Sequence, residues 1–168
     1  MVYLKEANYE DLEEEYRAIK SIPFYENGYG NTFCFMDRET FISVGIQKMI
    51  DSGRGVGLKE GHVPESYFFL WDDNRIVGLF KIRHYLSEEL RNGSGHLGFG
   101  IIKDFRNMHY GTEGLRLTLE KCRELVREDE VYMACFKYNK PSLAVMLNNG
   151  ARIVREDSEI YYTRVRIR

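Results

Sequence analysis

The segment from Lys103 to Glu113 places basic residues next to a glycine at the expected start of a helix. It reads Lys-Asp-Phe-Arg-Asn-Met-His-Tyr-Gly-Thr-Glu, so a short loop joins Arg106 to Gly111. The first turn of a helix leaves backbone N–H groups unpaired, and the helix dipole favours negative charge there. The segment therefore predicts an anion site, with phosphate as its natural guest. The alternative is an ordinary strand-to-helix connection with a surface arginine.

The same loop resembles the signature of the GNAT acetyltransferase superfamily, Arg/Gln-x-x-Gly-x-Gly/Ala. Arg106 and Gly111 occupy its outer positions. A second match starts at Asn139, where Asn-Lys-Pro-Ser is similar to the family's Asn-x-x-Ser/Ala, and Gly150 follows at the end of the last expected helix. The resemblance covers the chain from about Ser66 to its end, while the N-terminal third matches only in outline.

The resemblance implies an N-acetyltransferase with acetyl-CoA as co-substrate and no metal. It implies a GNAT fold of the α/β (α+β) class, in which a mixed, mostly antiparallel sheet of about seven strands is flanked by about four helices. A splayed pair of strands would hold the acyl-CoA, and a backbone N–H of the first strand, near Gly98 to Ile102, would polarise the thioester. By the same resemblance, the residues that bind acetyl-CoA are Ile101, Ile102, Arg106, Met108, His109, Tyr110, Gly111, Thr112, Glu113, Asn139 and Ser142.

Two positions depart from the family pattern. The first glycine of the signature is His109, although glycine tolerates backbone angles that cost other residues energy. The tyrosine that many relatives use as a general acid is Met146. Because a thiol has a pKa of roughly 8.5, it can leave without a strong acid nearby.

The expected fourth strand carries no carboxylate, although relatives often place their general base there. His96 is the nearest titratable residue, and a histidine with a pKa of about 6.5 can accept a proton at neutral pH. We therefore take His96 as the candidate catalytic base; the alternative is that it only satisfies a turn. Glu65, Glu88 and Glu89 could line the acceptor cleft, and solvated surface is the competing interpretation.

The elements that position these residues follow from the hydrophobic pattern. A strand over VYLKEA precedes a helix for which Asn8 is the expected N-cap, and FYENGYGNTF is expected to be a loop. The next helix, in DRETFISVGIQKMIDSGRG, has an apolar face of Phe41, Val44, Ile46 and Ile50.

The second half of the chain has a clearer pattern. SYFFLW and RIVGLFKIRHYL predict a hairpin around an Asp-Asp-Asn turn, and GHLGFGII predicts the next strand. The helix that follows carries Leu115, Leu119, Cys122 and Val126 on one face. VYMACFKY, RIVRE and IYYTRVRI predict three further strands, with a helix over PSLAVMLNNG after the first of them. We expect residues 1–168 to form a single domain.

Composition narrows the class of partner. The net charge is −2, from 24 basic and 26 acidic residues spread along the chain, which argues against nucleic acid as the principal partner. There is no apolar run of membrane-spanning length and the N-terminus does not resemble a secretion signal, so we expect a cytoplasmic location and no membrane partner. Cys34, Cys122 and Cys135 are well separated, which suits reduced thiols and predicts no metal site.

The acceptor and the oligomeric state stay open. Small amines, amino acids, aminoglycosides, polyamines and peptide or protein amines are all compatible with the sequence, and a homodimer is possible. Two other functions compete with N-acetyl transfer: a non-catalytic acyl-CoA-binding or sensing module on the same fold, and an interaction domain that binds no CoA. His109, Met146 and the missing strand carboxylate favour the first of these.

Overall fold

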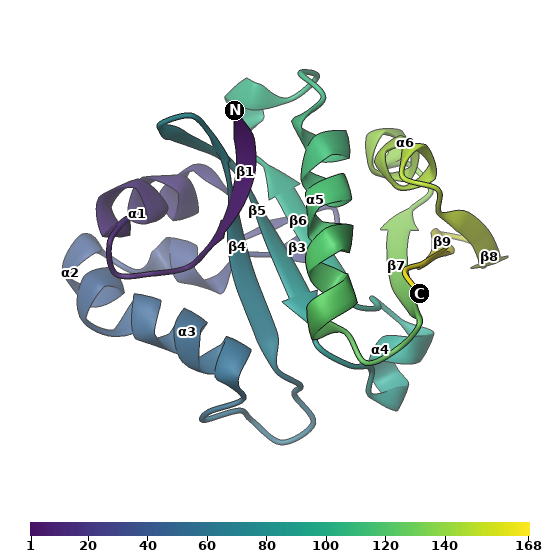
Figure 1. Cartoon of the computed structure of the whole chain (residues 1–168), viewed down its shortest axis with the longest axis horizontal. Helices are drawn as coiled ribbons and strands as arrows, with labels where there is room; N and C mark the ends of the chain where they lie inside the picture. The colour runs from purple at the N-terminus through teal and green to yellow at the C-terminus, as the bar shows by residue number, and fades with distance from the viewer.

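Two antiparallel sheets form the centre of the protein (Figure 1). The computed structural model describes all 168 residues. The larger sheet has four strands in the order β1-β4-β5-β6, and the second has three in the order β7-β9-β8, in agreement with the predicted seven. The strands span Val2–Glu6 (β1), Glu65–Asp72 (β4), Arg75–Arg83 (β5), Leu97–Ile101 (β6), Glu130–Phe136 (β7), Arg152–Glu156 (β8) and Ile160–Arg166 (β9).

Helices cover both faces of the larger sheet. Figure 1 shows α1 and α3 on one face and α5 on the other, with α6 beside α5. The helices span Leu12–Ser21 (α1), Arg38–Thr40 (α2), Ile46–Arg54 (α3), Glu88–Asn92 (α4), Tyr110–Leu125 (α5) and Lys140–Asn148 (α6). The chain between α1 and α2 forms a small hairpin of Tyr25–Glu26 (β2) and Tyr29–Gly30 (β3).

Alternation along β4 builds a core on each face of the larger sheet. Phe68 and Leu70 pack in the cluster under α5, whereas Phe69 and Trp71 pack in the cluster under α1 and α3. Successive side chains of a strand point to opposite faces, so a sheet with helices on both sides needs such continuous apolar runs. The run SYFFLW thus explains why β4 lies inside the sheet.

The two sheets meet at a single point. Gly95 and Met133 form an isolated β-bridge, and the His96 N–H donates to the Tyr132 carbonyl at 2.8 Å. Beyond this point β6 and β7 share no ladder, because β6 pairs only with β5 and β7 only with β9. This is the splayed pair that the sequence predicts.

The N-terminal half differs from the sequence prediction in detail. Helix α1 begins at Leu12, because the Asn8 side chain accepts from the Glu10 and Asp11 N–H groups and closes a turn ahead of the helix. The segment expected to be a loop contains the β2–β3 hairpin. The short helix α4, capped by Ser87, was not predicted.

The second helical segment also differs, because it contains a π-helical stretch over Phe41–Gly45. The wider turn rotates the buried face, so Val44 is 42% exposed although it was predicted to be buried. Phe41 and Ile46 face the core as predicted, and Met49 takes the place expected for Val44.

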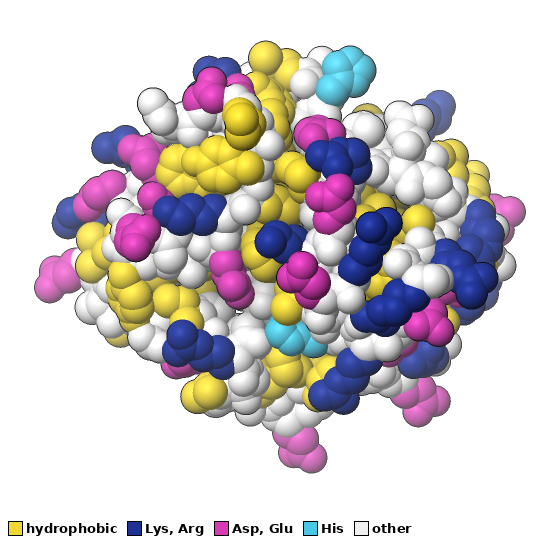
Figure 2. Space-filling view, in the orientation of Figure 1, with side chains coloured by type: hydrophobic (Ala, Val, Ile, Leu, Met, Phe, Trp, Pro, Cys, Tyr) yellow, Lys and Arg dark blue, Asp and Glu magenta, His cyan; other side chains and the backbone are white.

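Charged side chains of both signs are interspersed over the surface shown in Figure 2, and basic ones gather toward the side of the three-stranded sheet. No helix has the length and apolar character that a membrane crossing requires. No group of three or more His, Cys, Asp or Glu side chains is arranged to hold a metal ion.

Candidate functional site

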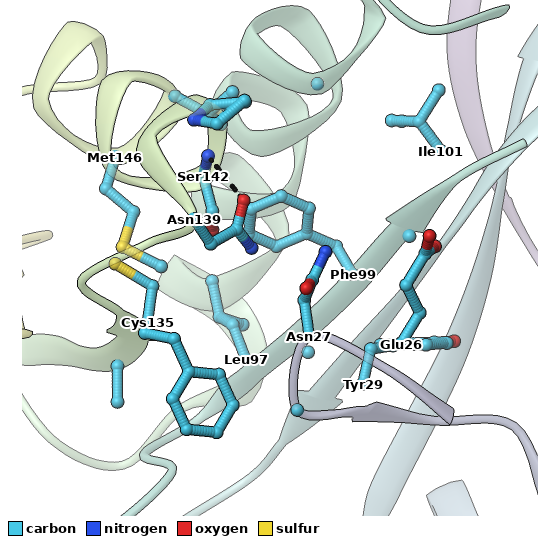
Figure 3. Close-up of a pocket in the computed structure, with 18 of the residues that line it drawn as sticks. Glu26, Asn27, Tyr29, Leu97, Phe99, Ile101, Cys135, Asn139, Ser142 and Met146 are labelled. Atoms are coloured by element: carbon cyan, nitrogen blue, oxygen red, sulfur yellow. Dashed lines mark hydrogen bonds between the residues drawn. The ribbon is translucent and has the colours of Figure 1, made fainter. Parts of the chain in front are cut away.

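A cavity of about 850 Å³ occupies the opening between β6 and β7 (Figure 3). Strands β5, β6 and β7, the loop leading into α5, the start of α6 and the β2–β3 hairpin all contribute to its lining. The cavity exists because the sheets join only at Gly95 and Met133. It runs from the N-terminus of α5 to the β5 side chains beneath β6.

Most of the residues expected to bind the cofactor line this cavity: Ile101, Arg106, His109, Tyr110, Gly111, Thr112, Asn139 and Ser142. Ile102, Met108 and Glu113 do not. The Ile102 N–H donates to the Val77 carbonyl at 3.0 Å, and the Glu113 carboxylate pairs with Arg116, so both groups are already engaged. The Met108 side chain is exposed.

The N-terminus of α5 forms one end of the cavity. Glu113 is the first helix residue whose N–H bonds back, to the His109 carbonyl at 3.1 Å. The amides of Tyr110, Gly111 and Thr112 therefore have no intrahelical acceptor, and they belong to residues that line the cavity. This end can receive an anion, as the sequence predicts.

His109 adopts the left-handed conformation immediately before α5, with φ 63° and ψ 3°. This is the position where the family signature has glycine, so the backbone keeps the glycine-like geometry despite the side chain. For a residue that has a Cβ, this conformation costs about 1 kcal/mol.

Replacing His109 by glycine is therefore expected to raise the free energy of unfolding by up to about 1 kcal/mol, because relief of strain outweighs the added freedom of the unfolded chain. Urea denaturation measures the change. Lys121→Gly, inside α5, is the matched control and should destabilise by about 1 kcal/mol. A loss of stability in both variants would contradict the strain argument.

Arg106 links the loop before α5 to the hairpin. Its guanidinium forms a bidentate ion pair with Glu26, with Nη1 3.1 Å from Oε1, and its Nε donates to the Ile101 carbonyl at 3.1 Å. The hydrogen bond from Arg106 lowers the pKa of Glu26. Both side chains line the cavity, so the cation lies where an anion would bind.

One edge of β6 is open to the cavity. The Arg83 N–H donates to the His96 carbonyl and the Ile102 N–H to the Val77 carbonyl, so the even-numbered residues of β6 face β5. In an antiparallel pair the odd-numbered residues then direct their N–H and C=O groups to the other edge. The Ile101 carbonyl, bound by Arg106, agrees with this pattern. The open-edge amides belong to Leu97, Phe99 and Ile101, which all line the cavity.

His96 lies outside the cavity, contrary to its predicted role as catalytic base. Its side chain is fully buried, with Nε2 3.0 Å from Glu128 and Nδ1 accepting from the Tyr132 N–H at 2.9 Å. Burial lowers its pKa. Both ring nitrogens are engaged, so the imidazole fastens β6 to β7 and is not available to a substrate.

The hairpin contributes Glu26 and Tyr29 to the cavity, and β5 contributes Lys81 and Arg83, which the sequence analysis missed. The Asn-Gly pair in the hairpin is a typical turn signal and could have indicated it. Lys81 interrupts an apolar strand, which was a second signal. Glu65, Glu88 and Glu89 lie in β4 and α4 and do not line the cavity.

The family model described as "Acetyltransferase (GNAT) domain" matches residues 3–152, and the chain belongs to this family. No curated protein matches the sequence. Solved structures share the fold at low identity, as follows.

The ribosomal-protein-S5-alanine acetyltransferase of Vibrio fischeri has a TM-score of 0.69 at 12% identity, over 98% of this chain and 92% of that one. A GNAT-family acetyltransferase of Streptococcus pneumoniae gives 0.64 at 14%, over the full length of both chains. The Campylobacter jejuni N-acetyltransferase PseH, in complex with acetyl coenzyme A, gives 0.59 at 16%, over 99% of each.

Proposed function

We propose that the protein is an acetyl-CoA-dependent N-acetyltransferase that transfers the acetyl group directly to a primary amine. The observation that carries the proposal is the cavity between β6 and β7, which joins a helix N-terminus to an open strand edge. One end suits the phosphates of a CoA thioester and the other presents amide donors. The complex of the similar PseH with acetyl coenzyme A supports this choice of co-substrate.

The residues of the loop before α5 are proposed to hold the pyrophosphate. The first-turn amides of α5 donate hydrogen bonds, and Arg106 adds a fixed positive charge. Asn139 caps α6 by accepting from the Ser142 N–H at 3.4 Å, so it also keeps the opposite wall in place (Figure 3). Neither role requires a metal.

The open edge of β6 is proposed to stabilise the developing oxyanion. When bound, acetyl-CoA supplies an activated acyl thioester. An amide of Leu97 or Phe99, fixed in direction by the β5–β6 ladder, can donate to its carbonyl oxygen without reorganising. The amine nitrogen forms the new C–N bond, the C–S bond breaks with its electron pair on sulfur, and one proton passes from nitrogen to sulfur or water.

No side chain of the cavity is proposed as a general acid. Met146 occupies the position of the family's tyrosine, is 2% exposed, and has its sulfur 3.4 Å from the Thr163 hydroxyl. Figure 3 shows it beside Cys135, whose pKa burial raises. A thiol with a pKa of roughly 8.5 leaves readily as the thiolate, so the reaction does not require a general acid.

Two measurements test the proposal. Calorimetry should find acetyl-CoA bound with a dissociation constant between about 1 μM and 1 mM. Mixing the protein with acetyl-CoA and a panel of amines should release free thiol in proportion to N-acetylated product. Absence of saturable acetyl-CoA binding would overturn the proposal.

Arg106→Met is expected to weaken acetyl-CoA binding about 10- to 100-fold, because the charge-assisted contact to phosphate is lost. Arg116→Met is the matched control: Arg116 lies on the outer face of α5, pairs with Glu113 and Glu120, and does not line the cavity. Calorimetry of both variants measures the difference. Equal affinities would place the phosphates elsewhere.

A second candidate function is a non-catalytic acyl-CoA-binding module. It is favoured by the burial of His96 outside the cavity and by Met146 at the position of the general acid. Binding without thiol release from any amine would support this alternative.

A further inference from the structure

Two basic side chains lie on the hairpin side of the cavity. Lys81 and Arg83 alternate along β5, so both point to the same face of the sheet. Lys81 is paired with Gly98 of β6, and a Cβ at Gly98 would lie 3.4 Å from its Cε and 3.5 Å from the Tyr29 ring. The missing side chain at Gly98 leaves room for the lysine and the tyrosine under the strand edge.

The ammonium group of Lys81 lies among several groups that attract a cation, although burial and Arg83 disfavour its charge. Nζ donates to the Gly30 carbonyl at 3.0 Å, lies 4.7 Å from the centre of the Tyr29 ring and 5.9 Å from that of Tyr67, and is 3.9 Å from Glu65. Burial lowers the pKa of Lys81, while the carboxylate opposes this change. Only 12% of the side chain is exposed. The ammonium group has three N–H donors, and the Gly30 carbonyl accepts from only one of them.

The positive charge on this side is only partly neutralised. Arg83 donates to the Gly95 carbonyl at 2.9 Å and lies 3.0 Å from Glu65, so a single carboxylate serves both cations. The only acidic residue that lines the cavity is Glu26, and Arg106 holds it. The wall therefore has an excess of positive charge and no free carboxylate for a second ammonium group.

We propose that Lys81 and Arg83 select an acceptor amine that carries a carboxylate, such as an amino acid, over polyamines and uncharged amines. This rests on the proposed acetyl transfer. Lys81 pairs with the carboxylate, which holds the acceptor beneath β6. The same positive charges disfavour an ammonium ion, so they increase the fraction of neutral, nucleophilic amine without a carboxylate base.

The test uses the standard amino acids, each compared with its own carboxamide, and spermidine as a polycation. The wild-type protein should acetylate at least one amino acid with a kcat/KM about 10- to 100-fold above its amide. Lys81→Met should remove that preference, whereas Lys81→Arg should keep most of it. Lys48→Met, an exposed lysine of α3 outside the cavity, is the control and should behave as wild type.

Several outcomes would overturn the inference while leaving acetyl transfer standing: equal rates for acids and amides, preference for spermidine, or an unchanged preference in Lys81→Met. If no amine reacts, calorimetry with the CoA-saturated protein decides, since no binding of any amino acid would also overturn it. Circular dichroism confirms that each variant is folded. Failure to bind acetyl-CoA at all would count against the proposed function instead.

Discussion

Gly95→Ala is expected to lower the free energy of unfolding by at least about 3 kcal/mol, because the new Cβ has no room. Gly95 has φ +71°, and an added Cβ would lie 2.2 Å from the Tyr132 carbonyl oxygen, a backbone atom that cannot rotate away. The alanine must therefore break the bridge to Met133 that joins the two sheets. Urea denaturation measures the loss, and acetyl-CoA binding should weaken with it.

Gly61→Ala is the matched control for this prediction. Gly61 has a similar conformation, with φ +80°, but an added Cβ would meet nothing within 4 Å. It should therefore report backbone strain alone, about 1 kcal/mol. If Gly95→Ala cost no more than Gly61→Ala, the close approach of the two sheets would not be a constraint on the fold.

Glu15→Gln is expected to remove a large pH dependence of stability. Glu15 is fully buried in α1; one carboxylate oxygen accepts from Asn8 at 3.1 Å and the other has no partner. Burial, helped by the charge of Asp11, raises its pKa to about 8, although the hydrogen bond from Asn8 and the charge of Lys5 act in the opposite direction. The folded protein thus keeps a proton that the unfolded chain, with a pKa near 4.5, releases.

Because the unfolded chain releases this proton at lower pH than the folded protein, the free energy of unfolding falls as pH rises. As pH rises from about 4.5 to about 8, the wild-type protein should lose stability relative to Glu15→Gln, by up to about 1.4 kcal/mol per pH unit. Below this window the difference between the two proteins should be constant. Chemical denaturation at a series of pH values measures it. Glu14→Gln, at a more exposed position of the same helix, should follow wild type; a flat difference for Glu15→Gln would mean that the carboxylate is solvated in the folded state.

The C-terminal two thirds of the fold could be predicted because its signals are local. Helix α5 and the β4–β5 hairpin follow from periodicity and turn residues that lie within a few positions of one another. The loop from Arg106 to Gly111 was recognisable for the same reason, and the left-handed geometry at His109 matches the family's glycine. The π-helical stretch that exposes Val44 left no such local signal.

The side chains at the cavity were harder to predict because their partners are distant in sequence. His96 is bound to Glu128, which removes it as a candidate base. Arg106 is bound to Glu26, 80 positions earlier in the chain. Lys81 stands out in an apolar strand, but its contact with the Tyr29 ring, which lies far from it in the sequence, is visible only in the folded structure. Such pairings depend on tertiary packing, which propensity and spacing do not encode.

The ion pair between Arg106 and Glu26 would make the two proposed ligand sites thermodynamically dependent on each other. Arg106 belongs to the loop proposed for phosphate, and Glu26 belongs to the hairpin that walls the acceptor side. A phosphate that takes over the guanidinium leaves Glu26 without its counter-ion, so its pKa rises and the hairpin loses an anchor. The free energy of that exchange contributes to the binding affinity of the second ligand. If the cofactor changes the affinity for the acceptor by some factor, the acceptor must change the affinity for the cofactor by the same factor.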